Sequence, residues 1–210
     1  MKKGCLIALG SVAGLMLLGV GSCIFVAVQY EKEHPELAQA SAALTQIETE
    51  VMSYRGNEGL GSSEQSRVLA KQFALGLQAG RQVFFTGKDD SKLSFTQGHF
   101  VTYCSLSAQR CVFIVHVPQL RNYTSEAETA MSEMAWRFAV ELLRAQKIEV
   151  KELAVGTHGV MKFGKILIGQ PSPTGDALRG VKQRTTDGHA LFPFLTGVTP
   201  SSKGPSGQKP

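Results

Sequence analysis

The amino-terminal part of the sequence has no charged side chain between Gly4 and Tyr30. This segment, residues 4–30, is rich in Leu, Val, Ile and Ala. It is longer than the roughly 20 apolar residues that a helix needs to cross a bilayer, and a helix satisfies its own backbone hydrogen bonds in lipid. The absence of an acidic residue excludes a pilin-like segment. The segment therefore predicts a membrane anchor.

Two alternatives to an anchor exist for residues 4–30. A cleavable signal peptide usually has an apolar region of only about 7 to 15 residues, and this segment is longer. The stretch Val20-Gly21-Ser22-Cys23 resembles a lipidation site, but the residues that follow Cys23 are still apolar. The length of the apolar run favours a retained signal-anchor.

The flanks of the segment predict its orientation. Lys2 and Lys3 precede it, and positively charged flanks stay on the cytoplasmic side. We therefore expect a single-pass protein with its amino terminus inside and its remaining domain on the extracytoplasmic side of a cell envelope. Gly10 and Gly14 have the GxxxG spacing that lets two helices approach in lipid, which leaves a homodimer open.

The sequence also lacks the short motifs of common catalytic sites. It has no GxSxG elbow, no GxxxxGK[ST] loop, no GxGxxG after a strand and no HExxH. Lys and Arg are scattered although the net charge is +5, so nucleic-acid binding is not expected. No cofactor is expected either. These absences favour a non-catalytic binding or assembly module over an enzyme.

The remaining chain divides into a helix, a domain and a tail. Apolar residues three and four apart predict a stalk helix over 31–55, which either packs on its own domain or forms a coiled coil. Residues 62–169 predict an α+β domain, and residues 170–210 form a tail rich in Pro, Gly and Ser. We expect the order helix, hairpin, helix, hairpin and a four-stranded, mostly antiparallel sheet.

The boundaries of these elements follow from caps and turns. Ser62, with Gln65 three residues later, predicts the start of the first helix, and Ser125, with Glu128, predicts a second helix that runs to about Gln146. Trp136 lies off the apolar stripe of that helix, so it either covers the sheet edge or anchors a partner. The expected strands are 93–104, 111–117, 148–155 and 160–168, with residues 156–159 as the turn of the second hairpin.

Two of the four cysteines, Cys104 and Cys111, lie in the expected first hairpin. In an oxidising compartment two cysteines on neighbouring strands can form a disulfide, which is our expectation, although free buried thiols remain an alternative. A bridge between directly opposite residues also sets the antiparallel register. His99 then faces His116.

The two facing histidines are the one constellation that suggests chemistry. His99 and His116 are candidate metal ligands or a pH-sensitive pair, and His158 would join them only if the second hairpin neighbours the first. No motif supplies a third ligand, so packing and hydrogen bonding are the simpler expectation.

The tail contains an apolar island at residues 190–195. It either docks onto the domain or serves as a short binding motif, with Phe192, Phe194 and Leu195 as candidate contacts for a partner.

Together these patterns predict a single-pass membrane-anchored cell-envelope protein. Its extracytoplasmic domain is expected to bind or assemble with a protein partner in the envelope. The alternatives are an envelope metal-binding domain or hydrolase centred on the histidine pair, and a pH-responsive sensor.

Overall fold

The computed structural model of the chain describes residues 32–53, 60–61, 63–79, 85–93, 99–105, 107–160, 162–172 and 175–196. Contacts divide the chain into two units, Met1–Ala38 and Gln39–Pro210. The predicted anchor, with Cys5, Cys23, Gly10 and Gly14, lies outside the described residues. Within the described ranges, no helix is both long and apolar enough to cross a membrane.

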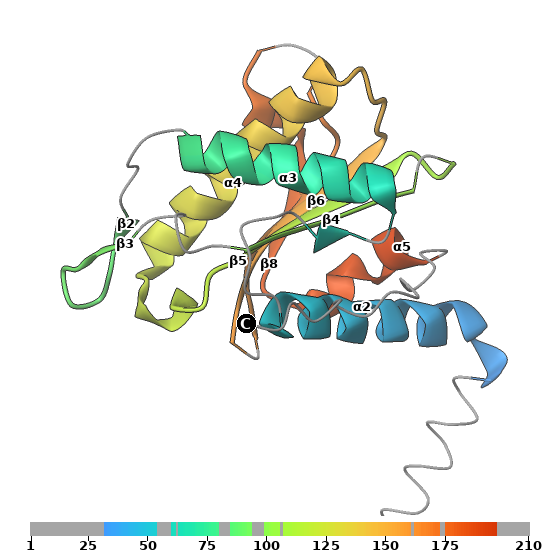
Figure 1. The fold of residues 1–210 in the computed structure, drawn as a ribbon, viewed down its shortest axis with the longest axis horizontal. Coiled ribbons are helices and arrows are strands. Elements are labelled where there is room, and N and C mark those ends of the chain that lie inside the picture. The colour runs from blue at the N-terminus through green and yellow to red at the C-terminus, as the bar shows by residue number, and fades with distance from the viewer. Residues whose placement is uncertain are drawn as a thin grey trace, which may run out of the picture. The chain divides into compact units, whose positions relative to one another are not determined.

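A mixed sheet forms the centre of the second unit, with the strand order β1-β4-β5-β6-β7-β8 (Figure 1). The strands are β1 (Leu60–Gly61), β4 (His99–Ser105), β5 (Arg110–His116), β6 (Glu152–Gly159), β7 (Lys162–Gly169) and β8 (Val181–Thr185). Neighbouring strands are antiparallel except in the pairs β1–β4 and β5–β6. The described chain is therefore α+β with a mostly antiparallel sheet, as predicted, but this sheet has six strands rather than four.

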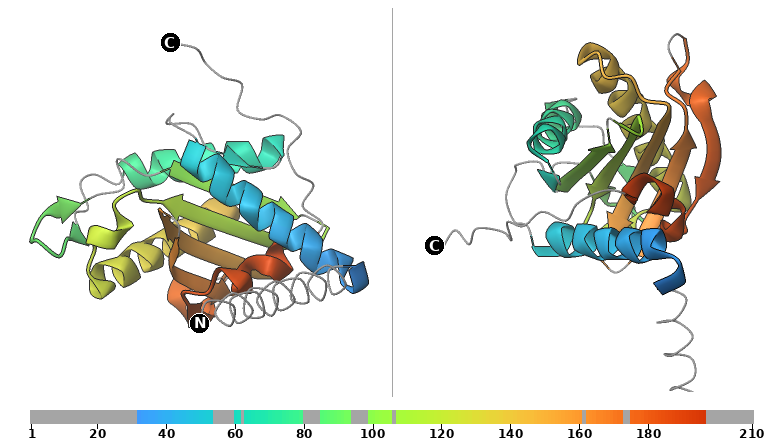
Figure 2. Two further views of the ribbon diagram at one scale, coloured as in Figure 1. Left: turned by 90° about the horizontal axis from the view of Figure 1, so that it is seen from below. Right: turned by 90° about the vertical axis from the view of Figure 1, so that its right-hand side faces the viewer.

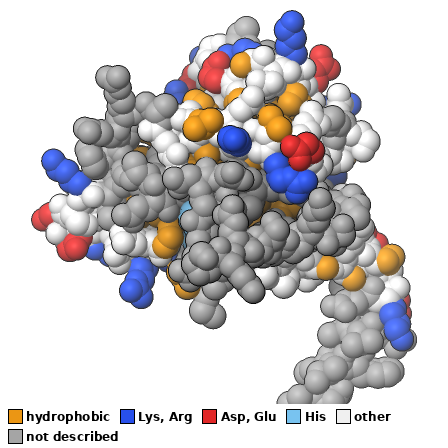
Figure 3. Space-filling model, viewed as in Figure 1, with side chains coloured by type: hydrophobic (Ala, Val, Ile, Leu, Met, Phe, Trp, Pro, Cys, Tyr) orange, Lys and Arg blue, Asp and Glu red, His pale blue; other side chains and the backbone are white. Residues whose placement is uncertain are grey.

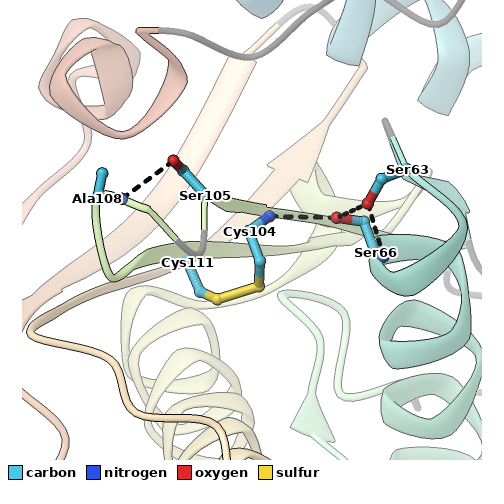
Figure 4. The surroundings of a disulfide bond; sticks show 6 residues. All are labelled: Ser63, Ser66, Cys104, Ser105, Ala108 and Cys111. Atoms are coloured by element: carbon cyan, nitrogen blue, oxygen red, sulfur yellow. Dashed lines mark hydrogen bonds between the residues drawn. A yellow bond between two sulfur atoms is a disulfide. The ribbon is translucent and has the colours of Figure 1, made fainter.

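The first hairpin has the predicted register. Cys104 lies opposite Cys111 and His99 lies opposite His116 in the β4–β5 pair. Cys104 and Cys111 form a disulfide, with their Cα atoms 4.1 Å apart (Figure 4). Next to it, the Cys104 N–H donates to the Ser66 hydroxyl at 3.2 Å. The short strand β1 pairs only with Val101 and Thr102 of β4, so it does not reach Cys104. This bond ties a helix to the end of the sheet.

A crossover helix places the second hairpin beside the first. Helix α4, Ser125–Ala145, connects β5 to β6, which run parallel, and such a connection requires a crossover. Its N-cap is Thr124, whose hydroxyl accepts from the Ala127 N–H at 3.1 Å, so the helix is capped one residue before the predicted Ser125. The predicted turn at 156–159 is wrong, because these residues lie in β6. His158 therefore lies in a strand.

Helix α3, Glu64–Ala79, and α4 cover one face of the sheet (Figure 2). Phe73 of α3 is fully buried, and its ring lies edge-on to Phe100 and tilted against Phe113, both on the sheet. At the start of α3, the Ser63 hydroxyl accepts the Ser66 N–H at 3.1 Å, whereas the predicted cap Ser62 lies outside the described residues. Burial of these aromatic rings is a major source of domain stability.

The opposite face of the sheet packs against helix α2, Pro35–Ser53, and helix α5, Phe192–Leu195. Ala40, Ala43 and Ile47 of α2 are buried against sheet residues such as Val112 and Ile114. The predicted stalk helix therefore packs on the domain from Gln39 onward, which is one of the two alternatives that the sequence left open. Because β5 is covered on both faces, its residues 111–115 form a continuous apolar run rather than an alternating one.

The predicted tail also joins the domain. Residues 175–196 contribute η3 (Ala177–Gly180), the edge strand β8, η4 (Gly188–Leu191) and α5. Trp136 is fully buried, and its indole N–H donates to the Ala177 carbonyl at 2.9 Å, which attaches this segment to α4. The domain therefore extends beyond the predicted limit at residue 169.

Three short elements complete the described fold. Strands β2, Phe85–Thr86, and β3, Lys92–Leu93, form a separate antiparallel pair. The 3-10 helix η2, Leu120–Asn122, leads from β5 towards α4.

Candidate functional site

Three histidines lie side by side across three neighbouring strands. His99 of β4 faces His116 of β5, and His116 faces His158 of β6. The ring centroids are 5.7 Å apart in the first pair and 5.3 Å apart in the second. Side chains alternate along a strand, so these rings lie on the sheet face that α2 covers. The sequence predicted the first pair, and the crossover through α4 adds the third residue.

His116 and His158 form the closest contact in this row. Their Nδ1 atoms are 3.0 Å apart, and the exposed fractions of the two residues are only 4% and 1%. A hydrogen bond between two Nδ1 atoms needs one to carry a proton and the other to present its lone pair. The two rings therefore share one buried hydrogen bond. It adds a side-chain link between β5 and β6 to the backbone hydrogen bonds of the sheet.

The ring of His158 has two further neighbours on this face. Phe163 of β7 lies edge-on to it, with the ring centroids 4.8 Å apart. From α2, Oε1 of Glu48 lies 3.9 Å from Nε2 of His158. This distance is too long for a hydrogen bond, but it allows an electrostatic attraction if the ring is charged. His158 thus lies where α2 meets the sheet.

Burial keeps both rings neutral. Burial, together with repulsion from His158 and His99, lowers the pKa of His116 from 6.5 to about 4, although a backbone hydrogen bond with His158 acts in the opposite direction. Burial also lowers the pKa of His158 from 6.5 to about 4. Two charged imidazoles would place two donors against each other at 3.0 Å. The arrangement is therefore incompatible with full protonation.

The structure offers limited support for a metal at this row. It brings the predicted ligands His99 and His116 next to each other and adds His158. Among the described residues, however, no group of three or more His, Cys, Asp or Glu side chains is arranged to hold a metal ion. The clearest chemical property of the row is therefore its response to protons.

A second candidate site is a groove at the carboxyl end of α4, with a volume of about 530 Å³. Four aliphatic side chains line it, of which two are buried and two half-buried: Val140, Leu143, Ile148 and Val150. The charged residues on its lining are Arg144, Lys147, Glu149 and Lys151, and Gln109, Pro171 and Ser172 complete it. Its volume falls within the range of about 300 to 1,000 Å³ typical of ligand pockets.

The shape of the groove depends on how α4 ends. The Lys147 N–H donates to the Arg144 carbonyl, and the Ile148 N–H donates to the Leu143 carbonyl at 2.9 Å. This pattern is a Schellman motif, in which the residue after the cap adopts a left-handed conformation. That residue is Lys147, with φ of 55°. Glycine is the usual choice there because it has no Cβ to strain.

The cations of the groove differ in their partners. Arg144 donates to Glu141 at 2.6 Å and to the Ser172 carbonyl at 3.0 Å, so its guanidinium is held in place. Lys147 and Lys151 are exposed, and neither forms an ion pair with a residue in the described part of the chain. On the face in Figure 3, basic side chains lie singly among acidic and apolar ones. The groove thus combines an apolar lining with available positive charge.

The predicted partner contacts lie elsewhere. Phe194 and Leu195 are buried against the sheet, and Phe192 is half-buried beside them. The apolar island therefore docks on the domain, which is one of the two alternatives that the sequence left open. The sequence did not indicate the groove, since its lining comes from the β4–β5 turn, the end of α4 and the segment after β7.

Comparisons with protein-family models, with curated proteins and with solved structures found no match to this chain.

Proposed function

We propose that this chain is a single-pass, membrane-anchored cell-envelope protein whose extracytoplasmic domain binds or assembles with a protein partner. Two observations support the placement. The uncharged segment 4–30 is long enough to span a bilayer, and Lys2 and Lys3 precede it. The Cys104–Cys111 disulfide is typical of an oxidising compartment.

The groove at the end of α4 is the observation that carries the binding role. An apolar centre with a polar or charged rim is the usual arrangement of a protein interface. Ile148 and Val150 supply half-buried apolar surface, and Lys147 and Lys151 supply exposed charge beside it. The domain thereby offers a surface on which a partner gains both burial and electrostatic attraction.

Chemical cross-linking in native membranes tests this function. The full-length protein, cross-linked before solubilisation and then purified, should be recovered in discrete larger species with a defined partner. A parallel sample that is solubilised before cross-linking controls for random collisions. If both samples contain only the protein without a cross-linked partner, a binding or assembly role is contradicted.

A pH-responsive role is a second candidate, favoured by the contact between His116 and His158. Because the pair is buried where α2 meets the sheet, protonation destabilises that junction. Recovery of the partner by cross-linking, measured at pH 7 and at pH 4, tests this role, because the two rings have a pKa of about 4 in the folded protein. Equal partner recovery at both values, with an unchanged melting temperature, would remove it.

A metal-binding or hydrolytic role is a third candidate, favoured by the facing positions of His99 and His116 on β4 and β5. Elemental analysis of the purified full-length protein tests it. Stoichiometric metal that is lost in a His99→Ala/His116→Ala variant would support it, and metal-free protein would end it.

A further inference from the structure

We infer that the groove at the end of α4 binds an acidic polypeptide segment that carries apolar side chains between its carboxylates. This inference rests on the proposed binding function and names the chemistry of the partner. It commits to a peptide segment rather than to an anionic lipid.

The lining of the groove determines which side chains it accepts. Leu143 is buried, whereas Ile148 and Val150 are half-buried and border the open space. A ligand that covers the last two removes their remaining apolar surface from water, which is favourable in proportion to the area buried. The groove therefore takes aliphatic or aromatic side chains.

The charges beside the groove determine which sign of charge the partner should carry there. Among the described residues that line the groove, three of the four charged ones are cations and Glu149 is the only carboxylate. Arg144 already donates to Glu141 and Ser172, so Lys147 and Lys151 are the cations available to a ligand. Two exposed ammonium groups beside apolar surface favour carboxylates on both sides of an apolar residue.

The backbone of Lys147 gives an independent reason to assign it a role. Its φ of 55° is a conformation in which a side chain is strained, and glycine would relieve that strain. The chain nevertheless carries a lysine at this position, beside the groove. Strained backbone conformations cluster at functional sites, which supports a role for Lys147 in the groove.

Selection from a random peptide library tests the inference, with the full-length protein in nanodiscs of uncharged lipid as the target. We expect the selected peptides to be acidic with central apolar residues. The Lys147→Glu/Lys151→Glu variant should bind them about tenfold more weakly or worse, because two attractions become repulsions. The Lys71→Glu/Lys162→Glu variant has the same net charge, and its exposed substitutions lie on α3 and β7. It should bind like the wild type.

A second variant separates binding from folding. Lys147→Gly should raise the melting temperature, because it removes the strained side chain, and yet weaken peptide binding. Loss of binding together with increased stability cannot be attributed to misfolding. Unchanged binding in this variant would remove Lys147 from the site.

Four results would overturn the inference. One is selection of peptides without acidic residues, and another is equal binding by both double variants. The third concerns laurate, a fatty-acid anion that serves as the probe for an anionic amphiphile. If laurate binds in a way that depends on Lys147 and Lys151 while no acidic peptide is selected, the occupant is an anionic amphiphile. If cross-linking still recovers the partner with the Lys147→Glu/Lys151→Glu variant, the groove inference fails while the proposed function stands.

Discussion

Nδ1 of His116 lies 3.0 Å from Nδ1 of His158 across the parallel strands β5 and β6, so two buried imidazoles share a single hydrogen bond. The contact joins two hairpins that are separated in the sequence by α4. Burial disfavours a charge on either ring and the contact excludes a charge on both, and these two properties lead to the first two predictions.

The free energy of unfolding should decrease as the pH falls from about 6.5 to about 4. His116 and His158 have a pKa of about 4 in the folded protein, against 6.5 in an unfolded chain. In this window the unfolded chain binds more protons, so acidification favours unfolding, and each ring contributes a slope of up to about 1.4 kcal/mol per pH unit. Above pH 6.5 their contribution is constant. Urea denaturation at a series of pH values measures this slope.

The control for this prediction is a comparison of two variants. His158→Asn should reduce the acid-side slope relative to wild type, whereas His189→Gln, at an exposed position, should leave it nearly unchanged. Identical slopes in all three proteins would show that the buried pair does not govern acid stability.

The two rings should differ in tautomer at neutral pH. Glu48 near Nε2 of His158 favours a proton on that nitrogen, which leaves Nδ1 of His158 as the acceptor. His116 should then carry its proton on Nδ1 and donate it. Long-range ¹⁵N–¹H correlation spectra distinguish the two tautomers directly. Two rings both protonated on Nε2 would leave no proton for the Nδ1 contact and would contradict the assignment.

Breaking the Cys104–Cys111 disulfide should destabilise the domain by about 2 kcal/mol. The bridge closes a short loop, with a sequence separation of 7, so its effect on the unfolded chain is modest. Unfolding should therefore shift to lower urea when reductant is added. A Cys104→Ala/Cys111→Ala variant should not respond to reductant, and a wild type that also fails to respond would contradict the prediction.

Phe194→Ala should cost about 3 to 4 kcal/mol of stability, because it empties a buried site in the core on the α2 face. Pro193→Ala changes an exposed neighbour and should cost much less. Thermal unfolding of both variants measures the difference. A Phe194→Ala protein as stable as Pro193→Ala would mean that the apolar island is not part of the core.

The sequence predicted the parts of the fold whose signals are local. The cysteine bridge implied a register, and the structure has His99 opposite His116 as that register requires. The end of α4 was also close to prediction, because its apolar stripe has a clear helical period.

Elements determined by distant contacts were not predictable in the same way. Strand β8 contains Lys182, Gln183 and Arg184, all exposed, so it lacks the alternation that marks a strand, although charges of this kind are common on edge strands. The pairing of β5 with β6 depends on the path of α4, and the groove depends on three separate segments. No pattern within a short stretch of sequence predicts contacts between segments that are far apart in the chain.

Protease treatment of right-side-out membrane vesicles from the source organism tests the central claim most directly. If the segment 4–30 anchors the chain with its domain outside, added protease should degrade residues 39–210 while the vesicles stay sealed, and the protein should sediment with the membranes. An enclosed cytoplasmic protein must remain intact as the control. A domain that is protected until the vesicles are broken, or a full-length chain that stays in the soluble fraction, would contradict the account.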